Sequence, residues 1–109
     1  MLANGGDEFE TLWARLQGCL HAGTKVPYWG VRRGYSGRAF QVTCVDERSI
    51  AITGSGLSIQ RTISRKELQR IHARWRGYCD GSIQRQTLRP LSFNTSFILS
   101  ILRWLEECC

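Results

Sequence analysis

Six residues near the middle of the chain, Ile63-Ser64-Arg65-Lys66-Glu67-Leu68, constrain the fold more than any other stretch. Ser64 can cap a helix, because its hydroxyl accepts a hydrogen bond from a first-turn amide that has no partner within the helix. Glu67 can reach back to the Ser64 amide and complete a capping box, while Ile63 and Leu68 can pack together as a hydrophobic staple. The sequence therefore predicts that a strand ends and a helix begins at Ser64.

The residues after this junction have the periodicity of one helix. Apolar side chains recur at spacings of three and four on one face, and basic side chains recur at steps of four on another. Gly77 weakens the predicted helix and Asp80-Gly81 ends it. The apolar face comprises Leu68, Ile71, His72, Trp75 and Tyr78, and the basic stripe comprises Lys66, Arg70 and Arg74.

Two further helices are predicted, one near each end of the chain. Asp7 to Ala22 carries an apolar stripe, begins with a capping pair formed by Asp7 and Glu10, and is followed by Gly23. The last helix runs from about Thr95 to Glu107, with Asn94 or Ser92 as its cap. It is apolar over most of its girth, so it is either a central helix between the sheet and the first helix or a dimer interface. Its apolar residues are Phe97, Ile98, Leu99, Ile101, Leu102, Trp104 and Leu105.

Short polar turns separate the predicted strands, as in an antiparallel meander. Ala39 to Val45 alternates with Phe40, Val42 and Cys44 on one face, and Asp46-Glu47-Arg48 turns the chain. Ile50 and Ile52 belong to the next strand, Gly54-Ser55-Gly56 forms a turn, and Leu57 to Ile63 forms the third strand. A fourth strand is possible over Val26 to Val31, where Pro27 would restrict it to a sheet edge.

These elements predict a single α+β domain over residues 1–109. An N-terminal helix is followed by an antiparallel meander of three to four strands and by two C-terminal helices packed on one face. Residues 1–6 and 108–109 are expected to be flexible.

Charge is concentrated in the middle of the chain. The net charge is +6, and 13 of the 15 basic residues are Arg. Between Lys25 and Arg89 there are thirteen basic residues but only four acidic ones. Because Arg makes planar, bidentate contacts with phosphate and carboxylate groups, the excess indicates a polyanionic partner, with a solvated basic surface as the alternative.

The segment from Gly23 to Arg38 interleaves aromatic and basic residues among glycines. Arginines can bind phosphates and rings can stack on bases, which favours nucleic-acid binding, although no motif of a known nucleic-acid module is present. The alternative is that the aromatic residues seal a sheet edge. The candidate contacts are Tyr28, Trp29, Arg32, Arg33, Tyr35 and Arg38 in this segment, with Lys66, Arg70 and Arg74 on the second helix.

Arg61 is a separate candidate. Strand alternation places it on the side of Ile59 and Ile63, and a charge that faces a core needs a partner or a route to solvent. It is therefore either an anion or buried-charge site under the sheet or a rim residue whose head reaches water.

Catalytic and metal-binding patterns are weak. Neither His21 nor His72 has a Ser or Cys partner visible in the sequence, and carboxylates are few. We therefore predict a protein that is not an enzyme and that has no cofactor and no metal.

The five cysteines fit no disulfide framework or zinc site by spacing. We expect them to be free, with Cys19 and Cys44 as small buried hydrophobes, in a reducing cytoplasm. No run is apolar enough to span a membrane.

One weak resemblance covers residues 60 to 100. The pattern Ile63-Ser64-Arg65-Lys66-Glu67-Leu68, Trp75-x-x-Tyr78 and Ser92-x-Asn94-x-Ser96-Phe97-Ile98 resembles small α+β proteins encoded on mobile gene (integron) cassettes, and it is similar to accessory domains near restriction-type nucleases. The resemblance implies a bacterial, cytoplasmic protein and carries over no catalytic residue.

Two functions remain open at this point. The first is a small basic module that binds DNA or RNA or acts as an accessory. The second is a homodimer, formed through the Phe97–Leu105 helix or a strand edge, that binds a small ligand or a partner protein in an apolar cleft.

Overall fold

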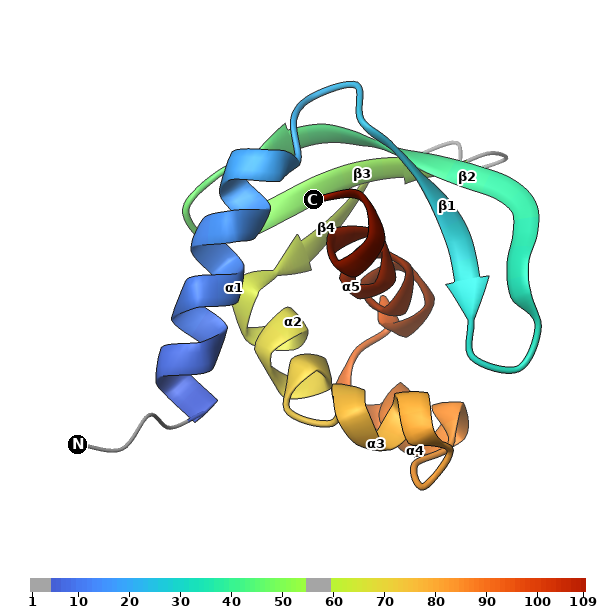
Figure 1. Ribbon diagram of the computed structural model, residues 1–109. Coiled ribbons are helices and arrows are strands. Elements are labelled where there is room, and N and C mark those ends of the chain that lie inside the picture. Colours follow the sequence, from blue (N-terminus) through green and yellow to red (C-terminus); the bar gives the residue numbers. More distant parts are fainter. Residues whose placement is uncertain (1–4, 55–59) are drawn as a thin grey trace.

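The chain folds as α+β, as the sequence predicts (Figure 1). The computed structural model describes residues 5–54 and 60–109, with side chains from Glu8 onward. The elements in order are α1 (Gly5–Cys19), β1 (Lys25–Gly30), β2 (Gly34–Val45), β3 (Ser49–Gly54), β4 (Arg61–Ser64), α2 (Arg65–His72), α3 (Trp75–Asp80), α4 (Arg85–Leu88), the 3-10 turn η1 (Arg89–Leu91) and α5 (Thr95–Cys108).

The four strands form one antiparallel meander in the order β1-β2-β3-β4. The sheet curves around α5, while α1 flanks one side and the α2–α4 segment lies at one end of α5 (Figure 1). The predicted turn Gly54-Ser55-Gly56 and the start of the strand from Leu57 fall largely on residues 55–59, outside the described residues; β4 is described from Arg61.

The predicted capping box at Ser64 is confirmed. The Glu67 amide donates to Ser64 Oγ over 3.1 Å, and the Ser64 amide donates to Glu67 Oε2 over 2.8 Å. The other carboxylate oxygen of Glu67 accepts from Ser92 Oγ over 2.7 Å and from Asn94 Nδ2 over 3.0 Å. The same carboxylate therefore starts α2 and ties it to the segment that leads into α5.

The single helix predicted after Ser64 is divided in two. The Arg74 amide donates to the Ile71 carbonyl, three residues back, instead of the Arg70 carbonyl. The Arg74 guanidinium takes the Arg70 carbonyl instead, over 2.8 Å, so the break leaves that acceptor satisfied. Trp75 then begins α3, and both Trp75 and Tyr78 are buried as predicted.

Two irregularities, both with the extra residues in β2, alter the alternation of that strand. The register of β1 and β2 shifts between Pro27 and Trp29, and that of β2 and β3 shifts between Val42 and Cys44. A bulge adds a residue to one strand and changes which side chains face the core. Cys44 is consequently exposed, so the prediction that it is a buried hydrophobe is wrong. β1 lies at the sheet edge, where Pro27 was expected to place it.

The last helix, α5, is the central helix of the fold, which is one of the two roles predicted for it. The side chains of Ile98, Leu99 and Ile101 are fully buried within the chain's own core. Most of the apolar surface of Phe97–Leu105 is covered by β1, α2 and the rest of the core, which leaves little of it for a dimer interface, and the dimer stays a prediction. Asn94 occupies the N-cap position of α5, but its side chain makes no capping bond and donates to Glu67 and to the Thr62 carbonyl instead.

The first helix begins earlier and the last one ends differently than predicted. α1 starts at Gly5, so Asp7 lies inside its first turn and is not a cap residue. Cys19, at the end of α1, forms a disulfide with Cys109, which corrects the prediction that all five cysteines are free. Arg15 reinforces this connection by donating to the carbonyls of Leu105 and Cys109 over 2.7 and 2.8 Å. Among the described helices, none has the length and hydropathy of a membrane span.

Candidate functional site

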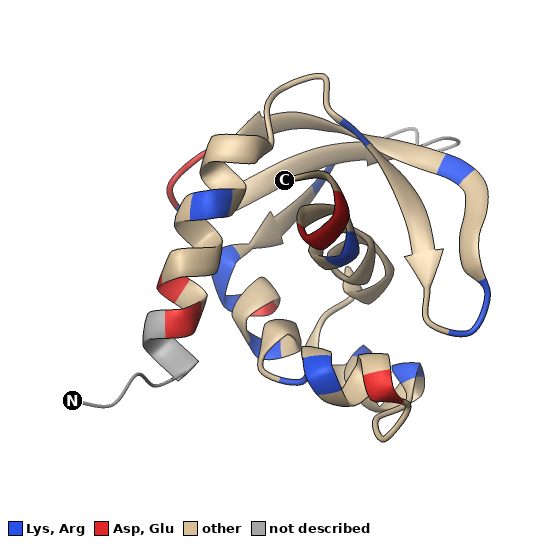
Figure 2. Ribbon diagram, viewed as in Figure 1, with Lys and Arg blue, Asp and Glu red and all other residues tan. Residues whose placement is uncertain are grey.

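The most distinctive surface feature is a basic cleft of about 800 Å³ between the β1–β2 hairpin and the segment from α3 to η1. Arg32 and Arg33 come from the hairpin end, and Arg85 and Arg89 come from the opposite wall. We call these four residues and the space between them the arginine cleft. Figure 2 shows the basic segments at the hairpin end and along the α3–η1 region. Asp80 is the one carboxylate among the lining residues of the described chain.

The hairpin wall is held by side chains from distant helices. Next to the register shift between β1 and β2, the Trp29 amide donates to Ser100 Oγ of α5 over 2.9 Å. The Val31 amide, just beyond the strand, donates to the Tyr78 hydroxyl of α3 over 3.0 Å. The ring of Trp29 also lies 5.7 Å from Trp75 and 6.1 Å from Tyr78, in tilted and edge-on arrangements. The turn end of the hairpin is therefore fixed against α3 and α5.

A tight turn after α3 shapes the helical wall. Gly81 ends α3 in the left-handed conformation, with φ of 88°, where a side chain would be strained. Ile83 then folds back onto Gly77, where an added Cβ would lie 2.5 Å from Cδ1 of Ile83. Hydrogen bonds from Ser82 hold the pKa of Asp80 below its usual range, so this carboxylate is ionised at neutral pH.

Among the residues that the structure describes, the cleft arginines have no carboxylate partners. The ion pairs of the described residues join Arg65 to Glu10 and Arg103 to Glu106 and Glu107. Arg85 donates instead to the hydroxyl of Ser96. Four guanidinium groups face one carboxylate in this cleft, so its potential is positive and favours an anion.

Two of the predicted aromatic contacts have structural positions instead. Tyr28 packs with its ring 5.2 Å from Phe40 and 5.7 Å from Phe97. Burial raises the pKa of its hydroxyl, against the opposing effects of Arg38 and Arg61. Trp29 is half-buried under the Arg103 guanidinium, which lies 5.0 Å from the ring centroid. Both rings are partly buried against the core and line the cleft, so their role as contacts for bases stays a prediction.

The other predicted contacts are divided between the cleft and the outer surface. Arg32 and Arg33 line the cleft, whereas Tyr35 and Arg38 are exposed on β2 outside its lining. The second-helix residues Lys66, Arg70 and Arg74 are exposed and also lie outside the lining. They do not form the predicted continuous stripe, because the helix breaks at Arg74.

Arg61 lies at the sheet rim. It is exposed, and its guanidinium lies 5.8 Å from the centroid of the Phe97 ring. The prediction of a buried charge under the sheet is therefore wrong, and the rim alternative holds.

Sequence reasoning missed Arg85 and Arg89 as partners of the hairpin. Both lie between the second and the last predicted helix, where the sequence predicts no element, whereas the structure contains α4 and η1 there. The Asp80-Gly81 pair did indicate a turn, but nothing local indicates which surface that turn faces.

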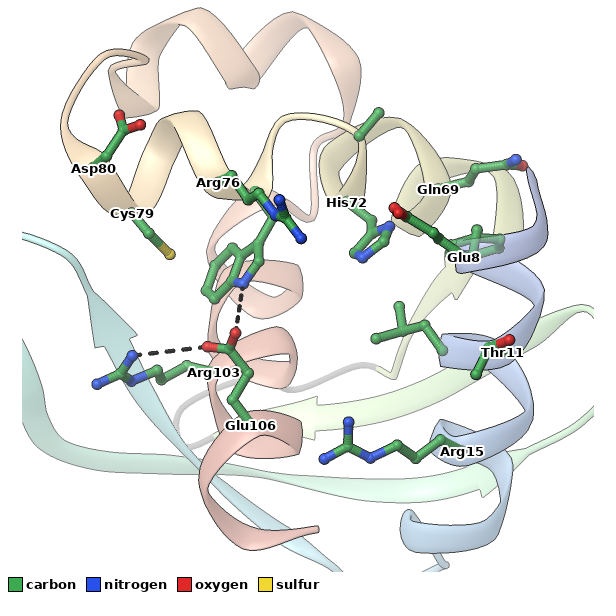
Figure 3. Close-up of a pocket in the computed structure, with 14 residues that line it drawn as sticks. Glu8, Thr11, Arg15, Gln69, His72, Arg76, Cys79, Asp80, Arg103 and Glu106 are labelled. Carbon is green, nitrogen blue, oxygen red and sulfur yellow. Dashed lines mark hydrogen bonds and ion pairs between the residues drawn. The ribbon is translucent and has the colours of Figure 1, made fainter. Parts of the chain in front are cut away.

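A second groove, of about 1080 Å³, lies between α1, the α2–α3 segment and the end of α5 (Figure 3). His72 and Glu8 approach each other across it, and Arg15, Arg76 and Glu106 surround it (Figure 3). Its charged lining is balanced, with arginines 15, 76 and 103 against Glu8, Asp80 and Glu106. Part of this charge is internal to the fold, because Glu106 accepts from the Trp75 indole over 3.2 Å and pairs with Arg103.

The groove lacks the geometry of a catalytic site. Burial is the main cause that lowers the pKa of His72. Arg76 lowers this pKa further, whereas Glu8 and Glu106 act to raise it, and the net shift is downward, so the ring is neutral at pH 7. Burial, and then Glu106, raise the pKa of the Cys79 thiol, which keeps it protonated. Over residues 8–54 and 60–109, no hydrogen bond joins His72 to a carboxylate or thiol, and no cluster of His, Cys, Asp and Glu could hold a metal. The arginine cleft is therefore the stronger candidate.

Comparison with known proteins finds no match: no protein-family model, no curated protein sequence and no solved structure is significantly similar to this chain.

Proposed function

We propose that this protein is a non-enzymatic module that binds nucleic acid through the arginine cleft. The observation that carries the proposal is the convergence of Arg32 and Arg33 with Arg85 and Arg89, from two separate segments, in a cleft without a matching set of carboxylates. Guanidinium groups bind phosphates in bidentate fashion, and a fixed concave basic surface strengthens that attraction. The resemblance to cassette-encoded proteins and the cytoplasmic location stay predictions.

The homodimer alternative has less support. At the end of β1 the Trp29 amide donates to Ser100, and just beyond the strand the Val31 amide donates to Tyr78. On β4, Asn94 donates to the Thr62 carbonyl. A strand edge whose backbone groups are already bonded to side chains is a poor template for another strand.

Fluorescence anisotropy with a labelled oligonucleotide tests the proposal. The affinity is expected to fall steeply with salt, because each neutralised phosphate releases counterions; four contacts predict a log–log slope of about −3. The double variant Arg85→Gln/Arg89→Gln should lose affinity and show a shallower slope. The matched control Lys66→Gln/Arg70→Gln removes the same charge outside the cleft and should have a much smaller effect.

Two outcomes contradict the proposal. One is the absence of binding to any DNA or RNA probe at about 50 mM salt, where electrostatic binding is strong. The other is an equal loss of affinity in the two double variants, which would indicate that only the overall charge matters.

A further inference from the structure

The two walls of the arginine cleft come into contact at Gly30, the last residue of β1. A Cβ atom added to Gly30 would lie 3.6 Å from the Tyr78 hydroxyl and 4.0 Å from Nη1 of Arg85. The same hydroxyl accepts the Val31 amide over 3.0 Å, so the hairpin is bonded to α3 at this point. All four of these residues line the cleft. The guanidinium of Arg85 therefore lies where the two walls meet.

Arg85 is held at this contact by α5. Its Nη2 donates to the hydroxyl of Ser96, a half-buried residue in the first turn of α5 that also lines the cleft. Because a hydroxyl carries no charge, this bond orients the guanidinium without neutralising it. Among the residues that the structure describes, Nη1 of Arg85 has no hydrogen-bond or ion-pair partner. The guanidinium is therefore oriented before a ligand binds, and it keeps its charge.

We infer that the arginine cleft binds the terminal phosphate of a nucleic-acid strand, with Arg85 as its contact where the walls meet. This inference rests on the proposed function and names the group of the ligand that enters the cleft. A terminal phosphate carries a charge of about −2 at neutral pH, whereas each phosphodiester within a strand carries a single negative charge. Four guanidinium groups against the one carboxylate of Asp80 favour the more highly charged group.

The position of Arg85 favours the end of a strand over its middle. An internal phosphate has a nucleoside on both sides, so the strand would have to bend sharply to bring that phosphate to the contact between the walls. A terminal phosphate has a nucleoside on one side only and can enter first. The cleft volume of about 800 Å³ lies within the range of pockets that enclose small molecules, roughly 300–1,000 Å³, so the space suits the end of a strand and not a longer segment.

The experiment compares two labelled strands of about 12 nucleotides that differ only in having a phosphate or a hydroxyl at the unlabelled end. Each end is tested in turn by moving the label. At one end or the other, wild-type protein should bind the phosphorylated strand about 10-fold more tightly, as expected of one added hydrogen bond between charged groups. Arg85→Gln should remove this difference, whereas Lys66→Gln, which removes an equal charge outside the cleft, should preserve it. Ser96→Ala should reduce the difference by releasing Arg85, and Ser96→Thr, which keeps a hydroxyl, should restore it.

The possible results separate this inference from the proposed function. Equal affinity for phosphate-ended and hydroxyl-ended strands, both dependent on Arg85 and Arg89, would overturn the terminal phosphate as ligand and leave the basic cleft intact. A mononucleotide with the same phosphate should compete only weakly, because it lacks the other charges of the strand. Competition as strong as that of the phosphorylated strand would overturn nucleic acid as the source of the phosphate. Absence of binding to all strands at low salt would overturn the proposed function itself, and thermal melting checks that each variant is folded.

Discussion

The arginines of this protein behave differently in two regions. The first region is where α1 packs against α5 and the start of α2, and there the arginines make contacts within the fold. Arg65 pairs with Glu10 and lies 5.7 Å from the ring centroids of both Phe9 and Trp13. Arg103 similarly pairs with Glu106 and Glu107 and covers Trp29. In the arginine cleft, Arg32, Arg33 and Arg89 have neither a ring nor a carboxylate among their described contacts. We call the first set, completed by Arg15, the paired arginines.

The comparison teaches that net charge alone does not identify a binding surface. The paired arginines have partners within the chain: carboxylates, ring faces and, for Arg15, the carbonyls at the end of α5. Among the described residues, the cleft arginines have no carboxylate partner and converge on one cavity, which leaves them available for a ligand. If this division is correct, changes in the paired region should affect stability without affecting binding, and changes in the cleft should do the reverse.

The largest effect on stability is expected where the paired region is closed covalently. The disulfide of Cys19 and Cys109 spans 90 residues of sequence, so Cys19→Ser should lower the free energy of unfolding by about 2–4 kcal/mol. Urea denaturation measures the change, and a reductant should reproduce it in the wild type but not in the variant. Cys44→Ser is the control, because Cys44 is exposed and free and its replacement should have little effect. Weakened oligonucleotide binding in Cys19→Ser, under conditions where it is folded, would contradict the division.

The converse is expected for charge reversal in the cleft. Arg85→Glu/Arg89→Glu places two carboxylates beside Asp80, so oligonucleotide affinity at low salt should fall about 100-fold or more. Both positions are exposed, so the melting temperature should change little. Titration of the same labelled probe with both proteins measures the loss. Reversal of Lys66 and Arg70 with a similar loss of affinity would move the binding surface away from the cleft.

Glu67 lies between the two regions, and its replacement should have an intermediate effect on stability. Its carboxylate accepts hydrogen bonds from the Ser64 amide, Ser92 and Asn94, so Glu67→Gln should cost about 2 kcal/mol. Burial acts to raise the pKa of Glu67, but these hydrogen bonds outweigh it and leave the pKa below its usual value. The ionised carboxylate therefore adds to the free energy of unfolding at any pH above the pKa that Glu67 has in the unfolded chain. This contribution is lost as the pH falls through the lower pKa that Glu67 has in the folded protein.

Denaturant titrations as a function of pH check this sign. The stability difference between wild type and Glu67→Gln should be constant near neutrality and should narrow below about pH 4. A difference that widens on acidification would contradict the hydrogen-bonding role.

The Glu67 junction also shows what the sequence can predict. Capping depends on residues three apart, so Ser64 and Glu67 gave the start of α2 correctly. The order of the strands, the edge position of Pro27 and the apolar character of α5 followed from equally local patterns. The participation of Ser92 and Asn94 in the same network could not be predicted, because it depends on contacts across 25 and 27 residues.

The candidate site was predicted only in part, for a related reason. The hairpin arginines stand out in the sequence, but the inward position of Tyr28 and Trp29 depends on a bulge. The amides at that bulge bond to Ser100 and Tyr78, which are 71 and 47 residues away from their donors. The opposite wall depends on the break of the helix at Arg74 and on the turn at Gly81. These are tertiary features, and periodicity in a single segment does not reveal them.

The smallest effect on stability is expected for Arg103, the paired arginine that lies on the ring of the cleft residue Trp29. Arg103 lies on the Trp29 ring, and its ion pairs with Glu106 and Glu107 have N–O distances of 3.7 and 3.3 Å on a partly exposed helix face. Exposed ion pairs and cation–π contacts each contribute about 1 kcal/mol or less, so Arg103→Gln should lower the free energy of unfolding by about 1 kcal/mol. Oligonucleotide affinity should stay within about twofold, because Arg103 is outside the cleft lining and its charge is already matched by carboxylates.

Arg32→Gln provides the matched comparison: it removes the same charge from the cleft and should weaken binding while leaving stability unchanged. If both substitutions reduce affinity equally, the carboxylates beside Arg103 do not set it apart from the cleft arginines, and the distinction between paired and free guanidinium groups fails.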